Sequence, residues 1–212
     1  DDLLQTWIGI GSQLDGLGHL GENGHYYNCL DEKEISAITG LTKLGTHAVP
    51  PLVGRGVILD MAAQAGVEVM EAGQSFGSEE IKAAAEAQNV ELREGDIVLF
   101  YTGWTDGMLE SNPALWGQAE PGLTNEGAVY MASLNPIAVG ADTWGLDAVP
   151  PAEGDKVFYG HVTLLKENGI YILETMNVGP LLEEGVNEFM FVLGQPRIIG
   201  SVQAMINPVA LY

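Results

Sequence analysis

Residues 94–101, Glu94-Gly95-Asp96-Ile97-Val98-Leu99-Phe100-Tyr101, join a turn to a continuous apolar run and decide the fold. The first three residues have turn chemistry, and the run at 97–101 predicts a strand buried on both faces. Upstream lies the clearest helix signal of the chain, with Ser78 as the expected N-cap, carboxylates in the first turn and helix formers up to Gln88. A helix followed by a buried strand is typical of α/β folds.

Further strands and a second helix are predicted on both sides of this helix and strand. Further strands are predicted at residues 3–10, Val57–Met61, Ile170–Leu173 and Phe189–Leu193. A second helix is expected from an N-cap at Thr124 to Leu134. Strands interleaved with only a few helices predict a β-rich α/β fold with a mixed sheet, and residues 1–212 are expected to form a single domain.

The bulk composition limits the kinds of partner. A hydrophobic content of 46% in 212 residues suits one packed globular domain. With 8 Lys and Arg against 29 Asp and Glu, the formal charge of -21 repels phosphate backbones and anionic membranes, so neither nucleic acid nor membrane is expected as a partner. A bound cation is compatible with this acidity.

The compartment is predicted from weaker signals. The single cysteine, Cys29, cannot form an intramolecular disulfide, and the sequence contains neither a long apolar run nor a leader-like start. A soluble, cytoplasmic protein is therefore expected. The chain begins almost directly at the loop described next, and one interpretation of this abrupt start is a fragment that lacks N-terminal strands.

A glycine-rich stretch, Gly9-Ile10-Gly11-Ser12-Gln13-Leu14-Asp15-Gly16-Leu17-Gly18-His19, is the first candidate for chemistry. It carries an amide, a carboxylate and an imidazole within seven residues, and its glycines allow a ligand to approach closely. By itself the stretch is also typical of a polar turn, in which Gln13 and Asp15 bond their own backbone. That plainer interpretation is favoured until a second cluster is considered.

The second cluster is His161 with Glu174. His161 opens a predicted short helix over 162–168 that ends at Gly169, a C-cap glycine, and a strand then returns to Glu174. A helix followed at once by a returning strand can bring its two ends together. The alternative is that the two side chains never meet.

In their order along the chain, these motifs resemble the cyclase family of metal-dependent hydrolases, the group that contains bacterial kynurenine formamidases and isatin hydrolase. Ser12–His19 is similar to the Ser-Gln-Trp-Asp-Gly-Leu-x-His site motif of one large subgroup. The other matching segments follow in the family's order: Tyr27-Asn28, Val53–Asp60, Gly95–Leu99, Thr102–Trp104, Val139–Thr143, His161 to Glu174 and Asn207–Ala210. The match covers nearly the whole chain, and the order of the motifs is more specific than any one of them.

The resemblance implies a cyclase-like (swivelling β/α/β) domain and metal ligands at Asp15, His161 and Glu174. It also implies that His19 is the general acid or base, and an unperturbed histidine pKa of about 6.5 is suited to proton transfer near neutral pH. The alternative is a structural histidine. The family's better-known motif, His-x-Gly-Thr-His-x-Asp-x-Pro-x-His, has metal-binding histidines where this chain has Gly9 and Gln13.

The loss of these histidines bears on the metal. Gln13 can serve as a weak ligand, as a partner of bound water or as a group that orients Asp15. The family uses zinc or manganese to activate water, and fewer histidines favour manganese or magnesium over zinc. The expected cofactor is a divalent metal ion, manganese or zinc.

The expected function is hydrolysis of a cyclic amide, a lactone or a formamide. Trp104, Tyr27 and Asn28 are the candidate substrate-binding residues, with Trp144 as a further candidate pocket residue, although each can equally belong to the core. The resemblance also implies a small-molecule substrate and a homodimer or homotetramer. The alternative, favoured by the two lost histidines, is a catalytically inactive relative that acts as a small-molecule-binding or assembly subunit.

Overall fold

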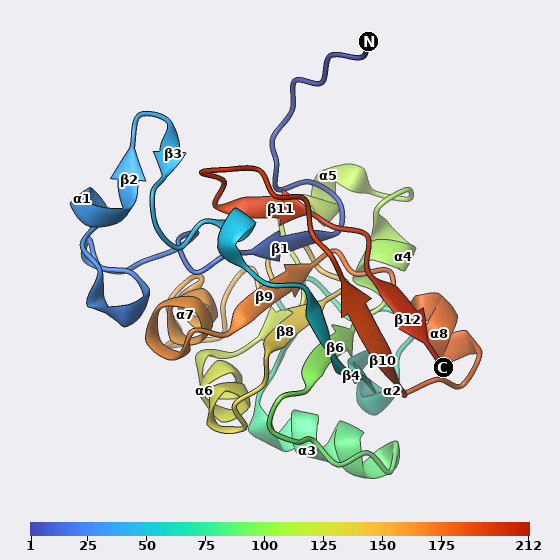
Figure 1. The fold of residues 1–212 in the computed structure, drawn as a ribbon. Coiled ribbons are helices and arrows are strands. Elements are labelled where there is room, and N and C mark those ends of the chain that lie inside the picture. Colours follow the sequence, from blue (N-terminus) through green and yellow to red (C-terminus); the bar gives the residue numbers. More distant parts are fainter.

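Four parallel strands form the centre of the protein, whose computed structural model describes residues 1–212 (Figure 1). They are β4 (Leu52–Asp60), β6 (Ile97–Tyr101), β8 (Ala138–Ala141) and β9 (Tyr171–Glu174). Strand β6 has the predicted bounds and lies between β4 and β8. Its side chains are buried on both faces of the sheet up to Phe100, as the continuous apolar run requires.

Antiparallel strands extend this centre at both edges. Strand β1 (Gln13–Asp15) lies between β9 and β11 (Gln203–Met205), and β10 (Glu188–Leu193) lies between β4 and β12 (Val209–Leu211). The strand order is β11-β1-β9-β8-β6-β4-β10-β12. The predicted α/β fold with a mixed sheet is thereby confirmed.

Helices cover one face of the sheet. They are α2 (Met61–Ala65), α3 (Ser78–Ala87), α6 (Asn125–Ser133) and α7 (Tyr159–His161), which continues into the π-helical turn η3 (Val162–Asn168). Alternate strand residues such as Val57, Val98 and Ile172 pack against them. The opposite face, with Ile58, Leu99 and Leu173, packs with β10 and α8 (Gly179–Glu183).

Short elements connect the main ones. They are η1 (Tyr27–Cys29), α1 (Glu32–Ile35), β2 (Ser36–Ala37), β3 (Gly40–Leu41), η2 (Thr46–Ala48), β5 (Ser75–Phe76), α4 (Trp104–Met108), α5 (Pro113–Trp116) and β7 (Gly122–Leu123). None of the helices combines the length and apolar composition needed to cross a membrane.

Two local predictions are wrong. Residues 3–10 form no strand, and residues 3–7 extend away from the body of the protein (Figure 1), with Leu3 97% exposed. Strand pairing begins only at Gln13, where β9 and β11 offer partners on both sides. The N-cap of α3 is Gly77 rather than Ser78, because the backbone N–H of Ser78 donates to Glu126 of α6.

The other local signals are confirmed. Thr124 is the N-cap of α6 and its side chain accepts the N–H of Gly127. Gly169 ends the helical segment in the left-handed conformation, with φ 68°. The helix after His161 and the return through β9 therefore follow the predicted path.

Candidate functional site

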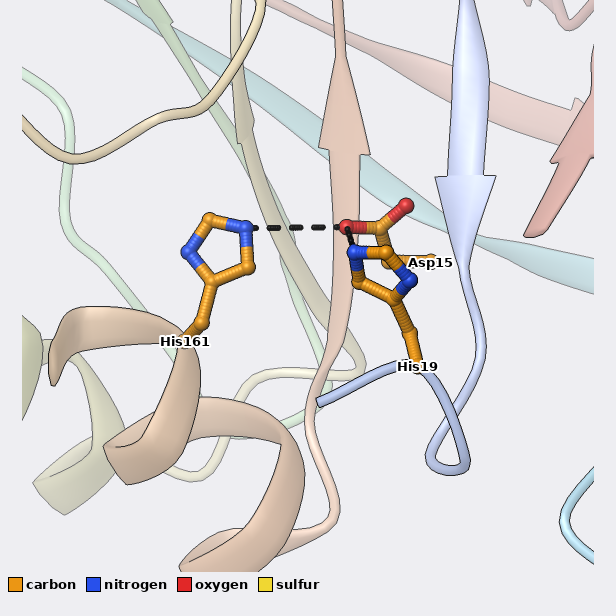
Figure 2. A group of neighbouring side chains, drawn as sticks. All are labelled: Asp15, His19 and His161. Atoms are coloured by element: carbon orange, nitrogen blue, oxygen red, sulfur yellow. Dashed lines mark ion pairs between the residues drawn. The ribbon is translucent and has the colours of Figure 1, made fainter. Parts of the chain in front are cut away.

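Side chains from distant parts of the chain meet beside strand β1. Figure 2 shows the rings of His19 and His161 directed at one oxygen of Asp15. The Nε2 atoms of His19 and His161 lie 3.5 and 3.6 Å from Asp15 Oδ2. Glu174 Oε1 lies 3.2 Å from His161 Nε2. The structure thus brings together Asp15, His19, His161 and Glu174, all four of which the sequence analysis singled out.

Strand pairing explains part of this convergence. Gln13 lies opposite Glu174 in the antiparallel β1–β9 pair, and the side-chain amide of Gln13 donates to Glu174 Oε2. Asp15 projects to the same face as Gln13, because side chains alternate along a strand. The turn after β1 then brings His19 back over Asp15, and Gly18 lets the turn pack closely against Leu41, whose side chain a Cβ at this position would displace.

Asp147, which the sequence analysis did not identify, orients His161. Its Oδ2 lies 2.6 Å from His161 Nδ1, and its Oδ1 accepts the N–H of Gly160 at 2.8 Å. With Nδ1–H donated to Asp147, Nε2 faces Asp15 and Glu174, and in the neutral ring it presents its lone pair to them. No motif marks Asp147 in the sequence, because it lies in the loop after β8, where its backbone forms only an isolated β-bridge with Leu123.

The cluster carries an excess of negative charge. Burial alone lowers the pKa of His161, but its hydrogen bonds to the carboxylates of Asp147 and Glu174, together with the nearby carboxylate of Asp15, outweigh this effect and hold the pKa well above its ordinary value. Burial, together with the charge of Asp15, raises the pKa of Glu174 to about 7. Three carboxylates around one imidazole provide a strong field for a cation.

The residues present fit a divalent metal ion. Asp15 Oδ2 is buried and has no hydrogen-bond partner. Ligand atoms of Asp15, His19 and His161 all lie within 4.8 Å of one another, and Glu174 Oε1 is adjacent to His161. Carboxylate oxygen and imidazole nitrogen are the donors that manganese and zinc accept in proteins.

A cavity of about 460 Å³ opens onto this cluster. Its aromatic wall consists of Trp116, Trp144 and Phe158. The indole N–H of Trp144 donates to the carbonyl of Trp116, and that of Trp116 donates to Thr105 Oγ1, so both rings are held in place. No lysine or arginine lines the cavity. Its volume suits a small organic molecule.

The three predicted substrate-binding residues lie elsewhere. Trp104 is only 2% exposed and belongs to the interior at the start of α4, because the chain after β6 turns inward. Tyr27 and Asn28 line a separate hollow beside Lys166. Of the aromatic candidates, only Trp144 reaches the cavity. Trp116 and Phe158 were missed because each lies in a segment with no recognisable motif.

The fold and the cluster define an α/β protein with a candidate metal centre beneath an aromatic-walled cavity. A family model described as "Putative cyclase" matches residues 2–148, which is more than half of the chain. The protein therefore belongs to this cyclase family. A comparison with curated proteins gives no match.

Solved structures share the fold. The crystal structure of a novel cyclase is 25% identical, with a TM-score of 0.89, and the match covers 100% of this chain and 70% of that one. Isatin hydrolase A from Labrenzia aggregata, bound to benzyl benzoate, is 20% identical with a TM-score of 0.66 over 96% of this chain and 73% of its own. An isatin hydrolase bound to the product analogue thioisatinate is 19% identical with a TM-score of 0.72 over 98% and 73%.

Proposed function

We propose that this protein is a metal-dependent hydrolase that cleaves the C–N or C–O bond of a cyclic amide, a lactone or a formamide. The observation that carries the proposal is Asp15 Oδ2, a buried oxygen without a hydrogen-bond partner that faces two imidazole nitrogens. Leaving such an atom unsatisfied costs about 1–3 kcal/mol, and a bound cation removes that cost. The isatin hydrolases of the same fold support the substrate class.

Asp15, His161 and Glu174 would hold the ion, for which manganese or zinc is the expected identity. When bound, the ion polarises the scissile carbonyl and makes water a better nucleophile near neutral pH. Asp147 accepts the hydrogen bond of Nδ1–H and so keeps Nε2 of His161 available. Gln13 bonds Glu174 and holds that carboxylate in position.

His19 moves the proton. Burial lowers its pKa against the opposing charge of Asp15, so the neutral imidazole predominates near pH 7 and accepts a proton from the attacking water. The new C–O bond forms as the C–N or ester C–O bond breaks, and His19 returns the proton to the leaving atom. Its side chain is 26% exposed and lines the cavity, where a substrate reaches it.

The cavity favours an uncharged substrate with a flat apolar part. Trp116, Trp144 and Phe158 offer ring faces and edges, and no lysine or arginine lines the cavity to bind an anionic substrate. Assembly as a homodimer or homotetramer stays a prediction, which light scattering of the purified protein tests.

A second candidate function is binding of a small molecule without turnover. It is favoured by Gly9 and Gln13, which replace histidines of the family's better-known motif. Under this candidate the cavity binds the same class of molecule, but no product accumulates at any metal concentration.

One set of measurements separates the two candidates. Metal content is determined by mass spectrometry, and a panel of cyclic amides, lactones and arylformamides is followed by ultraviolet absorbance before and after chelation. We expect hydrolysis that chelation abolishes and Mn²⁺ or Zn²⁺ restores. His19→Asn is expected to bind the metal and lose turnover. Hydrolysis that survives complete metal removal would refute the proposal, and ligand binding without product would favour the second candidate.

A further inference from the structure

We propose that the side-chain amides of Gln13 and Gln203 are positioning groups that restrict the cluster to one divalent ion. This inference rests on the proposed function, since it assumes that the cluster binds a metal. Neither amide is assigned as a ligand. Each acts through the carboxylate to which it donates a hydrogen bond.

Gln203 fixes Asp15. The two residues are paired across β1 and β11, so the strand register places their side chains together. Gln203 Nε2 donates to Asp15 Oδ1 at 2.8 Å. One oxygen of Asp15 is thereby occupied, and only Oδ2 remains open toward His19 and His161.

Gln13 fixes Glu174 in a similar way, by donating a hydrogen bond to one of its carboxylate oxygens. These residues are paired across β1 and β9, and Gln13 Nε2 donates to Glu174 Oε2. The remaining oxygen, Oε1, faces His161 Nε2 at 3.2 Å. Each carboxylate therefore directs one oxygen toward His161 and has the other occupied by an amide N–H.

The position of the Gln203 side chain depends on the absence of a side chain at Gly9. A Cβ at Gly9 would overlap the carboxamide of Gln203. Only a residue without a side chain leaves room for the amide that bonds Asp15. The glycine and Gln203 thus form one unit, although 194 positions separate them in the chain, from 9 to 203.

Charge and ligand chemistry then limit the site to one ion. A carboxylate oxygen that accepts an N–H hydrogen bond is a poorer metal ligand. The amide N–H also points its partial positive charge toward the place where a second cation would bind, and so repels that cation. Both oxygens of Asp147 are occupied, one by His161 Nδ1 and the other by the N–H of Gly160, so Asp15 and Glu174 are the carboxylates left open to a metal. Together they balance one divalent charge when the imidazoles are neutral. A second ion in this buried place would lack compensating charge, which is strongly unfavourable.

The test is binding of Mn²⁺ to the full chain, measured by calorimetry for affinity and stoichiometry and by electron paramagnetic resonance for ion–ion coupling. We expect one ion per chain with the spectrum of an isolated ion. Gln203→Met and Gln13→Met are each expected to weaken binding about 10–100-fold, the usual effect of losing a group that orients a ligand. Two ions per chain, or a coupled spectrum, overturns the inference and leaves the proposed function intact.

Gln195→Met is the matched control. Gln195 is 7% exposed, as Gln13 is, but its amide donates to the backbone carbonyls of Thr46 and Val49. This variant is expected to lose thermal stability with unchanged Mn²⁺ affinity. Equal loss of affinity in this control and the two variants would assign the amides a merely structural role and overturn the inference.

A double-mutant cycle tests the link to Gly9 with a substitution outside the core of the sheet. Gly9→Ala is expected to displace Gln203 and weaken Mn²⁺ binding as Gln203→Met does, and the double variant is expected to lose no more than either single variant. Additive losses contradict the coupling. Absence of any bound Mn²⁺ in the wild-type protein overturns the proposed function together with this inference.

Discussion

His161 and Asp147 form a buried pair in which Nδ1 and Oδ2 lie 2.6 Å apart. Asp147 contacts the ring on the side away from the Asp15 and Glu174 oxygens that face Nε2, so it sets the direction in which His161 presents its lone pair. The pair therefore links the loop after β8 to the candidate metal centre.

Asp147→Asn is expected to weaken Mn²⁺ binding by about 10–100-fold, because the amide no longer enforces protonation at Nδ1. Calorimetric titration measures the change. Asp155→Asn is the control, since Asp155 also accepts a backbone N–H, that of Asn125, but at another place. Unchanged affinity in Asp147→Asn contradicts the assignment of Asp147.

His161→Ala is expected to abolish Mn²⁺ binding and to destabilise the metal-free protein by about 3–5 kcal/mol at pH 6, because buried carboxylates lose their cationic partner. The folded-state pKa of His161 is raised. Its contribution to stability is therefore complete below about pH 6.5, the unfolded value, and is lost as the pH rises through the folded value. Urea unfolding at pH 6 and above measures this. Replacing the exposed His25 is the control, and an equal effect there would contradict the prediction.

Asp142→Asn is expected to flatten the pH dependence of stability between about pH 4 and 6. Burial raises the pKa of Asp142 to about 6, against hydrogen bonds from Thr102 that lower it. Ionisation is thus harder in the folded state, and the wild-type protein loses stability as the pH rises through this range, by about 3 kcal/mol for a shift of about two units. Above pH 6 the loss is constant.

Urea unfolding of the wild type and of Asp142→Asn at several pH values gives the difference curve. Glu153→Gln serves as the control because the carboxylate of Glu153 is exposed and is therefore not desolvated on folding. Parallel curves for the wild type and Asp142→Asn would count against an ionisable, buried Asp142.

Trp144→Ala is expected to weaken substrate binding, whereas Trp104→Ala is expected to destabilise the folded protein. Trp144 lines the cavity, so its loss raises KM by about tenfold, the equivalent of one aromatic contact. Trp104 is buried in the interior, so its loss costs about 3–5 kcal/mol of stability. Steady-state kinetics and urea unfolding distinguish the two effects. A larger KM effect at Trp104 would show that the cavity is not the substrate site.

Predictions from sequence succeeded where nearby residues determine the structure. The apolar run at 97–101 forms the predicted buried strand, Thr124 caps α6 through the N–H of Gly127, and Gly169 adopts the left-handed conformation that ends a helix. They failed at Ser78, where Glu126 of another helix supplies the acceptor. The failure at residues 3–10 has a similar cause, because apolar composition does not provide a partner strand.

The sequence by itself determined the α/β class, the helix and strand boundaries near strong caps, and four of the side chains that meet at the candidate site. Only the tertiary structure decided that Asp147 reaches His161, that Gln203 reaches Asp15, and that Trp116 and Phe158 line the cavity in place of Trp104. The physical reason is that caps and buried runs depend on free energies within a few residues. The partners of Asp15 depend instead on the register of β1 between β9 and β11, which form only when the whole sheet assembles.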